Sequence, residues 1–198
     1  MIEVEALTGE AIGPALSELA RLRIRVFAEW PYLYEGDFAF EEAYLAGFAA
    51  APGAVLVVAR DGEAIVGAST ASPMAAQSAD IRGPVETAGF DPATTCYFGE
   101  SVLMAGYRGR GLGHAFFDAR EDHARSLGLS AAMFAAVIRP EDHPARPENY
   151  RALDGFWRTR GYAPVEGLTC RLAWRDHGEA EESAKVLQFW RRALPPGG

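Results

Sequence analysis

The sequence predicts an α/β (α+β) protein with a single mixed, mostly antiparallel sheet of about six to seven strands and helices on both faces. The first observation is the order of periodic segments: a strand, two helices, three strands, then a helix, a strand, a helix, a strand and a last helix. The second is the unbroken apolar run AAMFAAVI (131–138), which is typical of a buried strand. The third is size, because 198 residues with 49% apolar composition suit one domain with a substantial core.

The N-terminal half changes between strand-like and helix-like periods. Apolar residues recur at helical spacing from Leu16 to Phe27, with Thr8 as a candidate cap and Pro14 near the start. Residues 73–93 are rich in Pro, Gly, Ala and Asp, so we expect an insertion or a mobile loop there. The expected elements of this half are a strand over 2–7, helices over about 14–30 and 38–50, a hairpin of 54–60 and 64–72, and a strand over 94–103.

The C-terminal half begins with an amphipathic helix over 113–127, where Glu121 precedes Arg125 by four residues and Gly128 is a stop signal. Its further expected elements are a strand over 131–138, a short helix over 148–162, a strand over 167–175 and a helix within 179–194. The last helix would place Val186, Leu187, Trp190 and Leu194 on one stripe. Residues 176–198 are therefore expected to be a helical extension that packs on the domain or on a dimer partner.

Composition and charge exclude several classes of protein. A net charge of −8 argues against nucleic-acid binding, which needs a basic surface. No apolar run reaches the length of a membrane span, and the N-terminus is acidic, so we expect a cytoplasmic protein with no membrane partner. Cys96 and Cys170 have no CxxC partner and are expected to be reduced core thiols. The frequent Ala, Arg and Gly are typical of a GC-rich bacterial genome.

The segment YRGRGLG (107–113) lies between an apolar run and a helix, where free main-chain N–H groups suit a phosphate or pyrophosphate. It is not a Walker loop, because Leu112 and Gly113 stand where Lys and Ser or Thr are required. It is not a dinucleotide fingerprint either, because His114 or Phe116 stands at the third glycine position. The four histidines lack metal-ligand spacing, and no metal site is expected.

The remaining pattern, Arg108-x-x-Gly111-x-Gly113 between a strand and a helix, resembles the acyl-CoA loop of the GNAT superfamily of N-acetyltransferases. The downstream element FWRTRGY (156–162) is similar to the family's LYEKLGF element. The resemblance covers residues 1 to about 175 and implies a GNAT-like domain there, with acetyl-CoA as co-substrate and no metal.

The resemblance also implies which residues hold acetyl-CoA. Val102, Leu103 and Met104 would meet the pantetheine arm. The phosphates would be held by Arg108, Gly109, Arg110, Gly111, Leu112, Gly113 and His114. Trp157 and Asn149 are the further cofactor candidates, Asn149 being one residue away from the position where the family often has an asparagine.

Acyl transfer to an amine needs a base and an acid for the leaving thiolate. Glu100, inside the apolar run YFGESVL, is the candidate base, and a structural carboxylate held by a nearby arginine or backbone amide is an equal alternative. The family often uses a tyrosine as the acid, but the matching position here is Trp157, whose indole cannot protonate a thiolate. Tyr150 and Tyr97 are the replacement candidates, or the thiolate leaves without direct help.

The acceptor site is expected at PYLYEGD (31–37), since the first two helices and their connection form the acceptor wall in the resembled family. Tyr32 and Tyr34 offer apolar faces with hydroxyl tips, and Glu35 and Asp37 would attract a cation. The alternative is a set of ordinary core aromatics beside a solvated turn.

These observations predict an acyl-CoA-dependent N-acetyltransferase that acts on the primary amine of a small molecule by direct attack. Two alternatives stay open: a non-catalytic acyl-CoA-binding or sensor module, and an acetyltransferase of protein N-termini or lysines. Dimerisation is common in the resembled family, so a homodimer is one expected arrangement.

Overall fold

The computed structural model describes residues 2–195 and contains one seven-stranded sheet in the order β1-β2-β3-β4-β5-β7-β6. Only β4 and β5 pair in parallel, and all other neighbours are antiparallel. This confirms the predicted single mixed sheet. The strands are β1 (Ile2–Thr8), β2 (Val55–Asp61), β3 (Ala64–Pro73), β4 (Thr95–Leu103), β5 (Ala131–Val137), β6 (Ala163–Trp174) and β7 (Ser183–Ala193).

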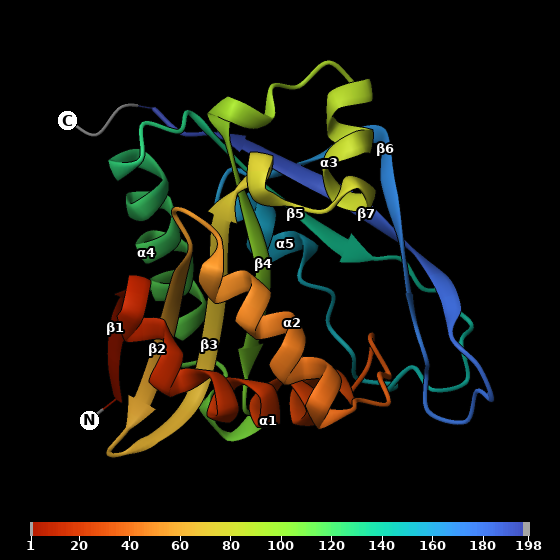
Figure 1. Ribbon diagram of the computed structural model, residues 1–198. Helices are drawn as coiled ribbons and strands as arrows, with labels where there is room; N and C mark the ends of the chain where they lie inside the picture. Colours follow the sequence, from red (N-terminus) through yellow and green to blue (C-terminus); the bar gives the residue numbers. More distant parts are fainter. Residues whose placement is uncertain (1, 196–198) are drawn as a thin grey trace.

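The helices cover both faces of the sheet, as predicted. Figure 1 shows α1, α2 and α3 on one face and α4 and α5 on the other. Among the helices within residues 2–195, none has the length and apolar character that crossing a bilayer requires. The α-helices are α1 (Leu16–Phe27), α2 (Phe38–Ala50), α3 (Ala79–Thr87), α4 (Leu112–Ser126) and α5 (Asp154–Thr159), and the 3₁₀ segments are η1 (Gly9–Ala15), η2 (Met74–Ala76), η3 (Pro92–Thr94) and η4 (Ala105–Tyr107).

The sheet is buried on both faces, which explains its continuous apolar runs. On β2, Val55 and Val57 pack into the core cluster beneath α4, whereas Leu56 and Val58 pack into the cluster beneath α1 and α2. A third cluster beneath α3 includes Phe189 of β7. The face covered by α4 therefore has one apolar cluster and the opposite face has two, and β2 to β4 form the wall between the first two clusters.

The predicted C-terminal helix is wrong, because its segment forms β7 between β5 and β6. Lys185, Leu187 and Phe189 alternate as buried residues on one face, which is the period of a strand. Trp190 and Leu194 are buried as well. Trp190 follows Leu187 by three residues and precedes Leu194 by four, so the sequence pattern resembles the apolar stripe of a helix. Residues 183–193 are thus part of the central sheet, and residues 196–198 of the predicted extension lie outside the described residues.

The expected insertion or mobile loop over 73–93 instead contains η2, α3 and the start of η3. Ile81 and Val85 lie one turn apart on α3 and are buried in the third core cluster. Their burial stabilises a helix in this segment, although its Pro and Gly content does not favour one.

The predicted helix over 148–162 is shorter in the structure, because α5 begins at Asp154. A separate turn precedes it, in which the Tyr150 N–H donates to the Pro147 carbonyl at 3.0 Å. At the other end of the chain, Thr8 precedes η1 without a side-chain capping bond, whereas Asp37 caps α2 by accepting from the Phe40 N–H at 2.8 Å.

Replacing Phe189 by alanine tests whether β7 is part of the core. Phe189 is 0% exposed, so Phe189→Ala should lower the free energy of unfolding by about 3–5 kcal/mol in chemical denaturation. The matched control is Phe40→Ala, because Phe40 is 60% exposed and should change stability by less than about 0.5 kcal/mol. Equal effects of the two variants would show that β7 is a loosely docked appendage.

Candidate active site

The centre of the site is the place where β4 and β5 part. The two strands pair only at Thr95 with Ala131, Cys96 with Ala132 and Tyr97 with Met133. Beyond Tyr97, β4 stays paired with β3 and β5 stays paired with β7. The second half of β4 therefore has main-chain groups on one side that no strand uses, and an extended ligand can pair with them.

β4 also contains a β-bulge at this place. Ser69 pairs with Ser101 and Ala71 with Phe98, so two steps along β3 correspond to three along β4. The extra residue reverses the faces: Phe98 packs beneath α4, whereas Glu100 reaches Arg23 of α1 on the opposite face. A Cβ at Gly99 would lie 2.4 Å from Thr70 Oγ1, which explains the glycine in the bulge.

Glu100 belongs to a buried charge cluster with Arg23 and Glu41. Arg23 Nη1 lies 2.7 Å from Glu100 Oε1, and Arg23 Nε donates to Glu41 Oε2 at 2.5 Å. Glu100 is 7% exposed and Glu41 is 1% exposed. Burial alone would lower the pKa of Arg23, but the charges of Glu100, Tyr44 and Glu41 raise it above its ordinary value. Two carboxylates and one guanidinium leave this cluster with one negative charge in excess.

The contact between Arg23 and Glu100 joins opposite charges but lacks the alignment of a hydrogen bond. Within the described chain, the buried Oε1 of Glu100 accepts no hydrogen bond. The Arg23 contact at Oε1 supports the predicted alternative of a structural carboxylate, whereas the absence of an aligned hydrogen-bond donor to this oxygen within the described residues is compatible with a base.

Three tyrosines surround this cluster. Burial and then the Glu100 carboxylate raise the pKa of Tyr32 to about 12. The Glu100 carboxylate and then burial raise the pKa of Tyr44 to about 12, and the Tyr44 ring lies 4.7 Å from the Arg23 guanidinium. Burial and the nearby Glu41 raise the pKa of Tyr34. Since Tyr44 is still 48% exposed, the cluster lies beneath a side chain that solvent and ligands can reach.

Arg139, at the end of β5, fixes the loop that carries Tyr32. Its Nε donates to the Pro31 carbonyl at 2.8 Å and its Nη2 to the Tyr32 carbonyl at 2.7 Å. Asp176 binds the same guanidinium through both oxygens, at 2.6 and 3.0 Å. Trp174 Nε1 also donates to the Tyr32 carbonyl, at 3.0 Å. The ends of β5 and β6 thus hold the main chain of Tyr32 in place.

Glu35 lies in an exposed ion pair on the same loop. Arg175 Nη2 is 3.1 Å from Glu35 Oε1, and the Glu35 N–H donates to the Arg175 carbonyl at 2.9 Å. A cationic ligand would have to share the Glu35 carboxylate with Arg175.

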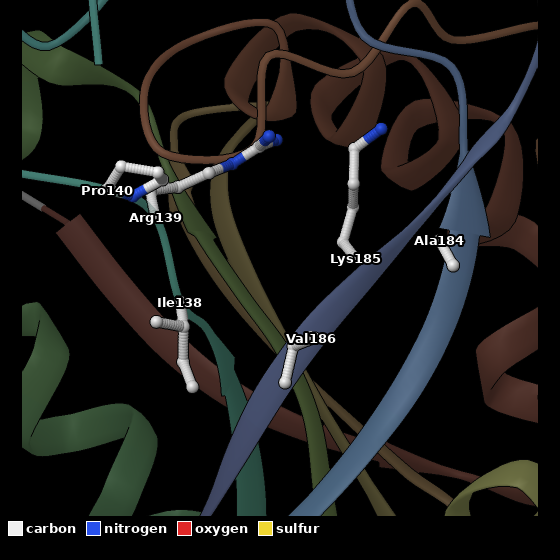
Figure 2. A pocket seen from close by; sticks show the side chains of 6 residues that line it. All are labelled: Ile138, Arg139, Pro140, Ala184, Lys185 and Val186. Carbon is white, nitrogen blue, oxygen red and sulfur yellow. The ribbon is translucent and has the colours of Figure 1, made fainter. Parts of the chain in front are cut away.

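A groove of about 550 Å³ lies next to this loop, lined by Ile138, Arg139, Pro140, Ala184, Lys185 and Val186. Figure 2 shows the charged ends of Arg139 and Lys185 turned away from Ile138 and Val186, whose side chains point in the opposite direction. Lys185 Nζ is bound by the Trp174 carbonyl and Glu179, and Arg139 by Asp176. The groove includes neither Glu100 nor the glycine-rich loop, and its two cations already have partners, so we place the site at the parting of β4 and β5.

The glycine-rich loop continues from β4 and ends in the first turn of α4. Gly109 and Gly111 have φ values of 75° and 82°, which other residues rarely adopt. Gly113 lies next to the Phe156 ring of α5, where a Cβ would be in ordinary van der Waals contact at 3.4 Å. The buried Leu112 anchors the loop in the core. The backbone conformation therefore requires glycine at 109 and 111, but not at 113.

The loop presents free amides and positive charge. Among the hydrogen bonds of the described residues, none uses the main-chain N–H groups of residues 109–113 as donors. Arg108 donates to the Leu103 carbonyl at 3.3 Å and pairs with Glu29 at 2.7 Å, while Arg110 donates to the Gly106 carbonyl at 2.9 Å. Free N–H groups at a helix start suit a phosphate.

The other predicted cofactor residues lie around the start of α4. The exposed His114 packs edge-on against Phe156, with ring centroids 4.9 Å apart. Trp157 packs against Phe134 and Trp190, with centroids 5.0 Å away in both cases. Asn149 is exposed in the segment before α5.

Tyr150 lies beside Trp30, with centroids 6.0 Å apart, at the edge of the loop over 31–37. Burial and then Asp154 raise the pKa of Tyr150, and burial and then neighbouring groups raise the pKa of Tyr97 well above its ordinary value.

Solved structures with a similar fold include acetyltransferases. One is an aminoglycoside 6′-N-acetyltransferase complexed with coenzyme A, 15% identical over 98% of this chain and 99% of that one, with a TM-score of 0.62. A Salmonella typhimurium protein solved with its cofactor acetyl-CoA is 12% identical over 100% of this chain and 96% of that one, with a TM-score of 0.60. A ribosomal-protein-alanine N-acetyltransferase from Brucella melitensis is 14% identical over 97% of this chain and 99% of that one, with a TM-score of 0.58.

The model of the Acetyltransferase (GNAT) family matches residues 18–150. The chain therefore belongs to the GNAT acetyltransferase family, and the predicted resemblance is confirmed. No curated protein matches the chain in sequence.

The sequence interpretation missed Arg23, Glu41 and Tyr44. Arg23 follows Leu19 by four residues and precedes Phe27 by four, so a charge stands within the apolar stripe of α1. Glu41 likewise precedes the buried Leu45 by four residues. A charge at a core position of an amphipathic helix was the available signal. Within residues 2–195, no group of three His, Cys, Asp or Glu side chains is arranged to hold a metal ion.

Replacing Arg139 by methionine tests how the Tyr32 loop is held. The variant leaves Asp176 without its bidentate partner and should lower the free energy of unfolding by about 3–5 kcal/mol. Arg175→Met is the matched control, because its pair with Glu35 is exposed and should contribute less than about 1 kcal/mol. Denaturant titration of both variants measures the difference, and equal values would contradict the assigned role of Arg139.

Proposed function

We propose that this protein transfers the acetyl group of acetyl-CoA to the primary amine of a small molecule by direct attack. The observation that carries the proposal is the position of Glu100, on β4 just past its parting from β5, ahead of the amide-rich loop on the same chain segment. Membership of the GNAT family supports the acetyl transfer, and relatives complexed with coenzyme A or acetyl-CoA support the cofactor.

Acetyl-CoA supplies a thioester activated for attack, and the loop residues fit its anionic part. The amides of Gly109 to Gly113 and the guanidinium groups of Arg108 and Arg110 would hold the pyrophosphate. Arg108 would exchange its pair with Glu29 for a phosphate, which is inexpensive because that ion pair is exposed. The main chain of Val102 to Met104 would pair with the pantetheine arm, with Leu112, His114, Asn149 and Trp157 nearby.

The acceptor would enter from the side of α1 and α2. The excess negative charge of the cluster formed by Glu41, Glu100 and Arg23 favours a cationic amine. Tyr32, Tyr34 and Tyr44 would line its path, and Glu35 would attract it at the entrance.

Glu100 would act as the base, directly or through a water molecule. An alkyl ammonium group at neutral pH must lose its proton before attack, which costs roughly 4–5 kcal/mol. Glu100 Oε1 accepts no aligned hydrogen bond within the described residues, which supports this role, and Arg23, 2.7 Å from the same oxygen, would hold the carboxylate in place.

Tyr150 would protonate the leaving thiolate. Trp157 packs in the core between Phe134 and Trp190, and its indole is no acid. Burial raises the pKa of the half-buried Tyr97 well above its ordinary value, whereas Tyr150 lies at the rim of the 31–37 loop beside Trp30, so Tyr150 is the better candidate acid.

Acetyl-CoA binding tests the cofactor site. Wild-type protein should show a higher melting temperature with acetyl-CoA, and Gly111→Ala should weaken binding about tenfold, or ~1.4 kcal/mol, in calorimetry. Gly89→Ala is the matched control, because Gly89 also has a φ of 82° but lies after α3. No stabilisation of the wild type at millimolar acetyl-CoA would refute the proposed cofactor.

Replacing Glu100 by glutamine tests the base. With a panel of amines and thiol release as the readout, Glu100→Gln should lower kcat by about 10²–10⁴-fold and leave acetyl-CoA binding unchanged. Glu86→Gln, in the exposed pair with Arg82 on α3, is the control. An unchanged pH–rate profile in Glu100→Gln would remove Glu100 as the base, and binding without turnover in the wild type would identify a sensor module.

A further inference from the structure

Arg120 of α4 is a buried cation without a carboxylate partner. It is 1% exposed, and within residues 2–195 no acidic side chain forms an ion pair with it. Burial lowers its pKa to about 10. Burying a guanidinium in this position has a desolvation cost that no ion pair offsets. Its other contacts should therefore indicate its structural role.

Arg120 contacts the β-bulge of the active-site strand. Its Nε donates to the Phe116 carbonyl at 3.1 Å, and its Nη1 lies 3.4 Å from the Thr70 carbonyl and 3.5 Å from the Glu100 carbonyl. Thr70 and Glu100 are the residues on either side of the bulge, where the regular β3–β4 ladder is interrupted. Arg120 therefore supplies a donor to carbonyl groups at the place where a bulge disturbs strand pairing.

The peptide units of Glu100 are held at both ends. The Glu100 N–H donates to Thr70 Oγ1 at 3.2 Å, and the Glu100 carbonyl faces Arg120. The guanidinium itself is fixed between two rings, 4.4 Å from the Phe98 centroid and 4.8 Å from the Phe117 centroid. Arginine suits this place because its planar group combines stacking on rings with several donors.

We propose that Arg120 is a positioning residue that holds the bulge in β4 and thereby keeps the Glu100 carboxylate on the acceptor side of the sheet. The inference rests on the proposed role of Glu100 as base. Without the extra residue in β4, Glu100 would face α4 together with Phe98, on the side of the sheet away from Arg23 and the tyrosines.

The test compares Arg120→Met with Arg192→Met. Arg192 binds Glu121, the neighbour of Arg120 on α4, at 2.8 Å and does not contact β4. Below their melting temperatures, Arg120→Met should lower kcat at least tenfold with the KM for acetyl-CoA within twofold of wild type, while Arg192→Met keeps the wild-type kcat. Arg120→Lys should recover part of the lost kcat. Wild-type kcat in folded Arg120→Met would overturn the proposal.

A double variant separates this inference from the proposed function. If Arg120 acts through Glu100, Glu100→Gln with Arg120→Met should be no slower than Glu100→Gln alone, whereas multiplied losses would overturn the positioning role.

Amide hydrogen exchange gives a readout that needs no activity. The Glu100 N–H should exchange at least tenfold faster in Arg120→Met, or in Arg120→Lys if the methionine variant does not fold, than in Arg192→Met. Equal exchange rates would overturn the proposal even if no acceptor amine is found.

Discussion

The extra residue in β4 is the constraint on which the rest of the site depends. Up to Phe98 the strand places Cys96 and Phe98 beneath α4 and Tyr97 on the opposite face, and after the bulge it places Glu100 and Val102 on the face of α1 and α2. The same stretch is where β4 leaves β5. One strand therefore lies first in the core and then beside the proposed binding site, and the change occurs within three residues.

Several buried charges lie around this change of role or hold the Tyr32 loop, whereas the buried Glu121 pairs elsewhere with Arg160 and Arg192. Arg23 with Glu41 and Glu100, Arg139 with Asp176, and Arg120 alone all lie within contact of β4 or of the Tyr32 loop. Apolar side chains of similar volume often stabilise a fold as well as a buried ion pair does. The cost of burying these groups is therefore best explained by the geometry that they impose on main-chain segments of the site.

The sequence was sufficient to predict those parts of the site whose structure depends on neighbouring residues in the chain. The glycines of YRGRGLG predicted a turn with free amides, and the positive φ values at 109 and 111 leave few other residues possible at these two positions. The sequence was insufficient to predict segments whose structure depends on residues distant in the chain. β7 pairs with β5 and β6, and its two-sided burial imitated a helix. The face of Glu100 depends on a bulge whose supports, Thr70 and Arg120, are 30 and 20 residues away.

α4 joins the two ends of the site through a fixed number of residues. Its first turn carries the free amides after Gly111, and Arg120 stands nine positions later, about two and a half turns along the helix. One inserted residue between them would rotate Arg120 by roughly 100° away from the bulge. The number of residues in this helix segment is therefore constrained as strictly as the identity of its side chains. The segment between β5 and α5 is not helical over most of its length, so an insertion there would not rotate a side chain in this way.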